Sequence, residues 1–158
     1  NPLAKSLRTT AQMILAGLDT RVYYVDTSGF DTHVNQAGQH QRLLGNYAGA
    51  MDAFIRDLKA GGRWNDVVVL TFSEFGRRVA QNASNGTDHG TANNLFLMGG
   101  QLKKPGIVNA APDLADLDRG DLKYQIDFRQ VYAELLQNWL GTPAKGILGS
   151  DFARLGLI

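Results

Sequence analysis

Apolar residues recur every three or four positions in three stretches of the chain, and this spacing predicts three amphipathic helices. The first helix is expected over residues 3–18, and the second over residues 39–60, where Gly61 and Gly62 follow it. The third is expected over residues 128–140, before a Gly-Thr-Pro sequence that closes it. The second helix has the most regular pattern of the three.

The second predicted helix carries both core and polar positions. Tyr47, Met51 and Phe54 have helical spacing and are predicted to lie in the core, with no functional role. His40 lies near the start of this helix and is interpreted as a solvated or capping residue. It is therefore left out of the candidate site.

Three short segments have the composition of strands. Residues 21–25 are aromatic and β-branched, residues 66–72 form a continuous apolar run, and residues 94–98 resume an apolar pattern. The continuous run is typical of a parallel strand covered on both faces. Residues 74–91 are polar and glycine-containing, and we expect a long functional loop there.

The order of these elements predicts an α/β domain with a mainly parallel sheet flanked by helices. Residues 1–158 are expected to form a single domain, because a chain of 158 residues suits one hydrophobic core. Three strands make a narrow sheet.

The composition restricts the partners and ligands. The chain has 16 basic and 15 acidic residues and no long basic stripe, so nucleic acid and anionic membrane surfaces are not expected as partners. No apolar run has the length of a membrane span. Because the chain has no cysteine, any metal must be held by oxygen and imidazole ligands. The oligomeric state stays open.

Five residues are candidate metal ligands: Asp31, His33, Glu74, Asp88 and His89. The first three follow predicted strands, so they are expected at the carboxyl edge of the sheet. Asp88 and His89 precede a strand, so the chain must return across the sheet to bring them there. These donors suit a divalent metal, and the imidazoles favour Zn²⁺ or Mn²⁺ over Mg²⁺ or Ca²⁺.

Structural alternatives exist for each candidate. His33 could bond a loop carbonyl, Glu74 could cap a helix or pair with a neighbouring arginine, and Asp88 could form an Asx turn. Arg77 and Arg78 are adjacent, so only one is expected to point toward a given site. That one could bind an anionic substrate group through charge-assisted hydrogen bonds.

Three ordered motifs, Gly29–Gln36, Thr71–Arg78 and Thr87–Ala92, resemble the bacterial domain-of-unknown-function family 1501 (DUF1501), a branch of the alkaline phosphatase and sulfatase superfamily. The resemblance extends from about residue 3 to residue 140. It implies a doubly wound, alkaline-phosphatase-like α/β fold with metal ions at the sheet edge, and hydrolysis of phosphate or sulfate esters. Asp31, His33 and His89 look like the ligands of one metal of that superfamily.

Two features of the chain depart from the superfamily pattern. Glu74 and Phe75 stand where superfamily members have an Asp-His pair, so the second metal lacks a ligand. In the superfamily the nucleophile belongs to an N-terminal half that nothing here matches. The resemblance therefore implies that the chain is the C-terminal part of a larger domain, in agreement with the narrow sheet.

The resemblance therefore implies a metal-dependent hydrolase-like domain, with a small anionic ester as substrate, in a periplasmic or exported parent protein. The alternative is a non-catalytic exported binding or structural module that retains the fold.

Overall fold

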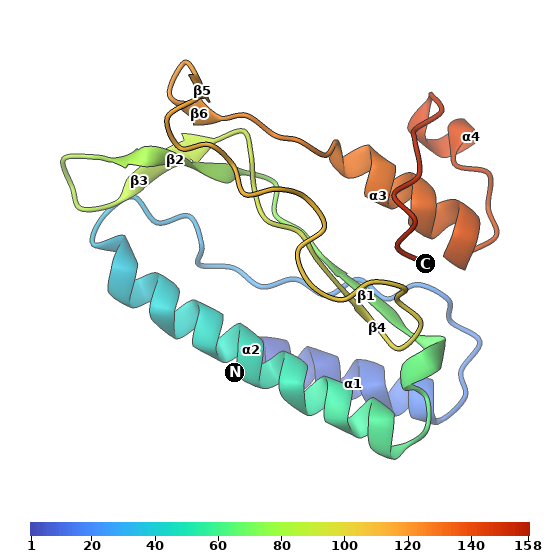
Figure 1. Cartoon of the computed structure of the whole chain (residues 1–158). Helices are drawn as coiled ribbons and strands as arrows, with labels where there is room; N and C mark the ends of the chain where they lie inside the picture. The colour runs from blue at the N-terminus through green and yellow to red at the C-terminus, as the bar shows by residue number, and fades with distance from the viewer.

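The computed structural model describes all residues from 1 to 158 and consists of helices and short antiparallel strand pairs (Figure 1). The helices are α1 (Pro2–Leu15), α2 (Gln36–Ala60), α3 (Phe128–Glu134) and α4 (Lys145–Leu148), with a 3-10 turn at Trp64–Asp66 and a π-helical turn at Leu135–Trp139. The strands are β1 (Val68–Thr71), β2 (Gly76–Gln81), β3 (Thr87–Gly90), β4 (Phe96–Gly99), β5 (Leu117–Asp118) and β6 (Asp121–Leu122). None of the helices combines the length and the apolar character needed to cross a membrane.

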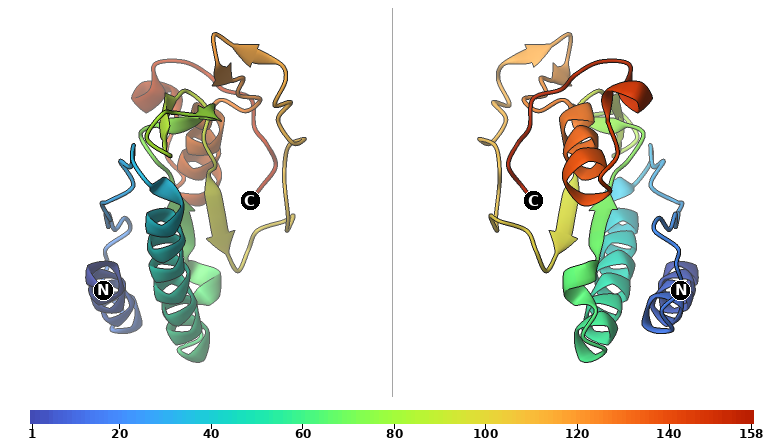
Figure 2. Two further views of the ribbon diagram at one scale, coloured as in Figure 1. Left: turned by 90° about the vertical axis from the view of Figure 1, so that its left-hand side faces the viewer. Right: turned by 90° about the vertical axis from the view of Figure 1, so that its right-hand side faces the viewer.

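Helices α1 and α2 pack together and form the main hydrophobic core. Asn1 caps α1 by accepting a hydrogen bond from the amide of Ala4 at 2.8 Å, and Pro2 follows at the first helical position. The buried core residues are Leu7, Ala11, Ile14, Ala50, Met51, Phe54 and Leu58, with Tyr47 packed beside them. The predicted helices and the core positions on α2 are confirmed. Figure 2 shows α1 and α2 to one side of β1 and β4, with residues 101–126 on the other.

The prediction of a mainly parallel sheet flanked by helices, in an alkaline-phosphatase-like arrangement, is wrong. Three separate two-stranded antiparallel sheets are present, namely β1–β4, β2–β3 and β5–β6. The apolar runs do form strands, but β1 and β4 pair with Val69 opposite Met98 in antiparallel register. The physical reason is the connection: parallel neighbours need a crossover, usually a helix. Here the segment between β1 and β4 contains the β2–β3 hairpin, and the chain returns beside β1 in the opposite direction.

Residues 21–25 form no strand. Tyr23 and Val25 pack against the helical core instead, while Val22 and Tyr24 are exposed. Buried and exposed side chains thus alternate along this segment, as in an extended chain with one face on the core. The prediction of a strand here was wrong because strand assignment also requires a hydrogen-bonded neighbour.

The segment predicted as a long loop, residues 74–91, contains the β2–β3 hairpin. Its turn is stabilised by Asn82, whose side-chain oxygen accepts hydrogen bonds from the amides of Ser84 at 2.9 Å and Gly86 at 3.0 Å. Asn85 adopts a positive φ of 57°, which asparagine tolerates well. The hairpin carries Asp88 and His89 toward the start of α2.

The C-terminal part is organised by Glu134 at the end of α3. Its side chain is fully buried and accepts hydrogen bonds from the backbone amides of residues 155–158. At the other end of α3, Asp127 and Gln130 form a capping box. The predicted third helix is therefore present, although its second half is the π-helical turn.

Candidate metal centre

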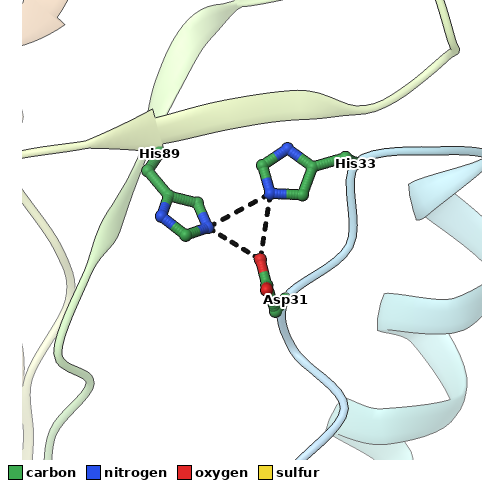
Figure 3. Close-up of side chains that lie close together, drawn as sticks. All are labelled: Asp31, His33 and His89. Atoms are coloured by element: carbon green, nitrogen blue, oxygen red, sulfur yellow. Dashed lines mark hydrogen bonds and ion pairs between the residues drawn. The ribbon is translucent and has the colours of Figure 1, made fainter.

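Asp31, His33 and His89 converge, with side chains that point toward one another (Figure 3). The Nε2 atom of His89 lies 2.7 Å from Asp31 Oδ1, and the Nε2 atom of His33 lies 2.9 Å from the same oxygen. The two Nε2 atoms are 3.2 Å apart. The side chains are 42–66% exposed, so solvent reaches this cluster.

Asp31 and His33 come from the segment that leads into α2. Because they are two residues apart in an extended segment, they lie on the same side of the chain, and Thr32 faces the other way. Thr32 is buried, and its hydroxyl lies 2.7 Å from Nε2 of His40. Gln36 donates to the carbonyl of Thr32 at 3.2 Å. His40 therefore anchors this segment from the protein side instead of being merely solvated.

His89 comes from β3, where it is paired with Arg77 of β2. The ring of Phe75 stacks on the imidazole of His89, with centroids 3.9 Å apart and planes at 7°. This contact covers one face of the imidazole. The ring edge that carries Nε2 is left to face Asp31 and His33.

The hairpin turn docks directly on the segment that carries His33. Asn82 donates its side-chain amide to the carbonyl of His33 at 3.0 Å, and the amide of Asn35 donates to the carbonyl of Ser84 at 3.0 Å. Gly86 lies so close that a Cβ atom on it would be 2.2 Å from the oxygen of His33. Glycine is required there by the close approach of two backbones.

Asp88 supports His33 from the opposite end of the imidazole. Its Oδ1 atom lies 3.5 Å from Nδ1 of His33 and accepts a hydrogen bond from Asn82 at 3.3 Å. This arrangement directs Nε2 of His33 toward Asp31 and His89. A carboxylate behind a ligating histidine is the usual way in which proteins fix the tautomer and the ring orientation.

Both carboxylates of the cluster have lowered pKa values. The hydrogen bond from His89 lowers the pKa of Asp31 most, and His33 adds to the effect. The hydrogen bond from Asn82 lowers the pKa of Asp88 most, followed by that from His33. Both groups are therefore carboxylates at neutral pH and are available as ligands or as hydrogen-bond acceptors.

The donor set fits a divalent metal in type and nearly in spacing. Ligand bonds of about 2.0–2.1 Å in tetrahedral geometry separate the ligand atoms by about 3.3 Å. The three ligand pairs here are separated by 2.7, 2.9 and 3.2 Å. Movements of a few tenths of an ångström in these exposed side chains would bring the atoms to the spacing of a tetrahedral site.

The sequence model of the family described as "Protein of unknown function (DUF1501)" matches residues 6–143. The chain belongs to this family. All residues of the cluster lie inside the matched range. No curated protein and no solved structure matches the chain.

Other predicted site residues of the DUF1501 chain lie outside the cluster. Glu74 is exposed and makes no side-chain hydrogen bond or ion pair, and it is not part of the Asp31, His33 and His89 group. Arg77 donates to the carbonyls of Thr87 and Phe30, each at 2.6 Å. Its neighbour Arg78 lies 3.4 Å from Asp121. The ligand role of Glu74 and the substrate-binding role of the two arginines stay predictions.

Sequence reasoning missed Asn82 and Phe75, the residues that hold His33 and His89 in place. A signal for the hairpin exists in Asn85-Gly86, because this dipeptide is strongly favoured in hairpin turns. This dipeptide indicates that residues 74–91 fold back on themselves. The stacking of Phe75 has no comparable sequence signal, since it depends on the pairing register.

Proposed function

We propose that the chain binds one divalent metal, Zn²⁺ or Mn²⁺, through Asp31, His33 and His89. The observation that carries the proposal is the convergence of these three side chains, whose ligand atoms all lie within 4.8 Å of one another. Two imidazoles and one carboxylate suit such metals and, in catalytic zinc sites, leave a fourth position for water or substrate.

The reaction proposed for the full-length protein is hydrolysis of a phosphate or sulfate ester, as in the alkaline phosphatase and sulfatase superfamily that the motifs resemble. The metal would polarise the ester oxygens and stabilise developing negative charge. Asp31 supplies negative charge to the site, and Asp88 holds the imidazole of His33 in one orientation. The nucleophile is not assigned to a residue of this chain.

One observation favours a second candidate function, a non-catalytic exported module with a structural metal or hydrogen-bond network. Phe75 stands where the resemblance expects a ligand of a second metal, and its ring is stacked on His89. A closed site would then tie the β2–β3 hairpin to the start of α2. An open coordination position, detected by binding of an added anion to the metal-loaded chain, would contradict this alternative.

Metal binding is tested by elemental analysis of the purified chain after loading with Zn²⁺, Mn²⁺ or Mg²⁺ and removal of excess ions. We expect close to one Zn²⁺ or Mn²⁺ per chain, and loss of that ion in a His33→Ala/His89→Ala double variant. An Asp116→Asn/Asp118→Asn variant, in which two carboxylates elsewhere are neutralised, serves as the control. Equal metal content in all three proteins would contradict the proposed site.

Ester hydrolysis is tested separately on the full-length protein with aryl phosphates and aryl sulfates. We expect turnover that depends on the added metal and that His89→Ala abolishes. A fully metal-loaded protein that is inactive on both ester classes, while still binding metal through these residues, would support the non-catalytic alternative.

A further inference from the structure

We propose that Arg77 is a positioning residue of the metal centre, which ties the segment carrying Asp31 to the strand carrying His89. This inference rests on the proposed metal site and adds to it a residue that does not bind the metal. Arg77 acts through the backbone of both segments and through a stack of side chains.

The first support is the pair of hydrogen bonds that Arg77 donates. Its Nη1 atom donates to the carbonyl of Thr87, two residues before His89, and its Nη2 atom donates to the carbonyl of Phe30, the neighbour of Asp31. Both distances are 2.6 Å. A guanidinium has its donors in one rigid plane, so it fixes the separation of two acceptors that it binds together.

The second support is the environment of the guanidinium. The side chain of Arg77 is 18% exposed, whereas that of the adjacent Arg78 is 44% exposed. Nη2 of Arg77 also lies 3.9 Å from Asp31 Oδ1. The positive charge is therefore held beside the carboxylate that receives both histidines.

The third support is a stack of three side chains. The Cζ atom of Arg77 lies 5.1 Å from the ring centroid of Phe75, and that ring stacks on His89. Phe75 and Arg77 are two residues apart in an extended chain, so they share a face, and His89 is the register partner of Arg77. The pairing of β2 with β3 thus brings all three side chains to one side of the hairpin.

These contacts differ from those expected of an arginine whose terminal donors are free to bind an anionic substrate. Two of its terminal donors are engaged by carbonyl oxygens of the protein. Releasing them would remove the link between the guanidinium and the carbonyl next to Asp31, although that carbonyl would still accept from the amide of Thr32 at 2.9 Å. The guanidinium thus links the backbones of two segments that lie 57 residues apart in the sequence, from Phe30 to Thr87.

The test compares Arg77→Gln and Arg77→Lys with Arg78→Gln, a matched variant of the adjacent arginine. In the metal-free chain, nuclear Overhauser contacts between the rings of Phe75 and His89, and between those of His33 and His89, report the arrangement directly. Zn²⁺ affinity is measured by competition with a chelator. We expect Arg77→Gln to lose the ring contacts and to bind Zn²⁺ roughly 10–100-fold more weakly, as for other supporting residues of metal sites. Arg78→Gln should change neither.

Arg77→Lys retains the charge but replaces the planar pair of donors with a single ammonium group, so it should weaken binding while keeping the fold. It provides the decisive comparison if Arg77→Gln fails to fold. Wild-type ring contacts and wild-type affinity in the Lys variant would overturn the proposal. If the wild-type chain binds no Zn²⁺ while the Arg77 variants lose the ring contacts, the proposed metal function fails and the positioning role stands.

Discussion

Two carboxylates hold the imidazole of His33 from opposite ends. Asp31 Oδ1 lies 2.9 Å from its Nε2 atom, and Asp88 Oδ1 lies 3.5 Å from its Nδ1 atom. Asn82 contacts both Asp88 and the carbonyl of His33. At the scale of single residues, the cluster is thus a small network in which each group has a defined partner. The ring of His33 can present only one nitrogen to a metal.

Replacing Asp88 by Asn should weaken metal binding without removing a ligand. The neutral amide is a poorer acceptor for the Nδ1 proton, so the tautomer and orientation of His33 become less fixed. We expect Zn²⁺ affinity to fall roughly 10–100-fold, as measured by chelator competition. The Asp116→Asn variant is the control, because Asp116 pairs with Lys123 elsewhere. An Asp88→Asn chain with wild-type affinity would show that Asp88 plays no supporting role.

The residue types of the cluster could be predicted from the sequence, whereas the residues that hold them in place could not. Asp31, His33 and His89 were candidate ligands from the sequence, and the structure brings them together. Glu74 was also a candidate ligand from the sequence, but the structure does not place it in this cluster. The difference lies in the pairing of β2 with β3, which places His89 toward the Asp31 segment. Such pairing is a long-range property that local patterns do not contain.

Glu134 connects α3 to the C-terminal segment. Burial of its carboxyl raises the pKa, but hydrogen bonds from the amides of residues 155–158 outweigh burial, and the net pKa is below the ordinary value of 4.5. A group with a lowered pKa in the folded state stabilises that state at pH values above its unfolded pKa. This stabilisation is lost as the pH falls through the folded pKa.

Glu134→Gln should therefore destabilise the chain at pH 7 and have a smaller effect in acid. Hydrogen bonds to a charged group contribute about 1.5–3 kcal/mol, so a loss of about that size is expected at pH 7. Urea denaturation at pH 7 and at pH 3 measures the difference between wild type and variant. A difference that stays constant between the two pH values would contradict the role assigned to the ionised carboxylate.

Glycine substitutions separate local conformational effects from steric ones. Gly49 lies in α2, with open space around the position of a Cβ atom, so Gly49→Ala should stabilise the chain by about 0.5–1 kcal/mol. Gly86 lies against the backbone of His33, so Gly86→Ala should destabilise it by about 1–3 kcal/mol. Thermal denaturation of both variants tests the prediction. Equal effects of the same sign would contradict the close approach at Gly86.

Helices were the elements best predicted by periodicity, because their hydrogen bonds are local. The two strands β1 and β4 were also found, yet their direction was wrong, since it depends on the hairpin between them. Residues 21–25 show the same limit. Their alternation correctly reflects one face on the core, but no partner strand pairs with them.

The chain has an unusually large surface. Its accessible area is 10406 Å², whereas a compact monomer of 17.2 kDa is expected to expose roughly 7,800 Å² from the scaling of area with mass. Only 16 of 158 residues are buried, so the core is small for the length of the chain. Part of the excess is apolar. Aromatic side chains gather at one place, between the end of β1 and α3.

This aromatic patch consists of Phe72, Phe128 and Tyr132. Tyr132 contacts Phe72 and Phe128 edge to face, with ring centroids 6.1 and 5.3 Å apart. Phe72 is 48% exposed and Phe128 is 57% exposed. Apolar rings that remain in contact with water in this way favour binding of apolar dyes and self-association.

We expect the folded chain to bind the dye anilinonaphthalene sulfonate, and a Phe72→Ser/Phe128→Ser variant to bind much less of it. Removal of exposed rings should cost little stability, since neither side chain belongs to the buried core. Ile107→Ser is the matched control, because Ile107 is 91% exposed but lies away from the patch in sequence and has no aromatic partner. Dye fluorescence, together with sedimentation velocity at increasing concentration, distinguishes the outcomes. If the Ile107 variant loses as much fluorescence as the double variant, the dye reports general exposure, and the aromatic patch has no special role.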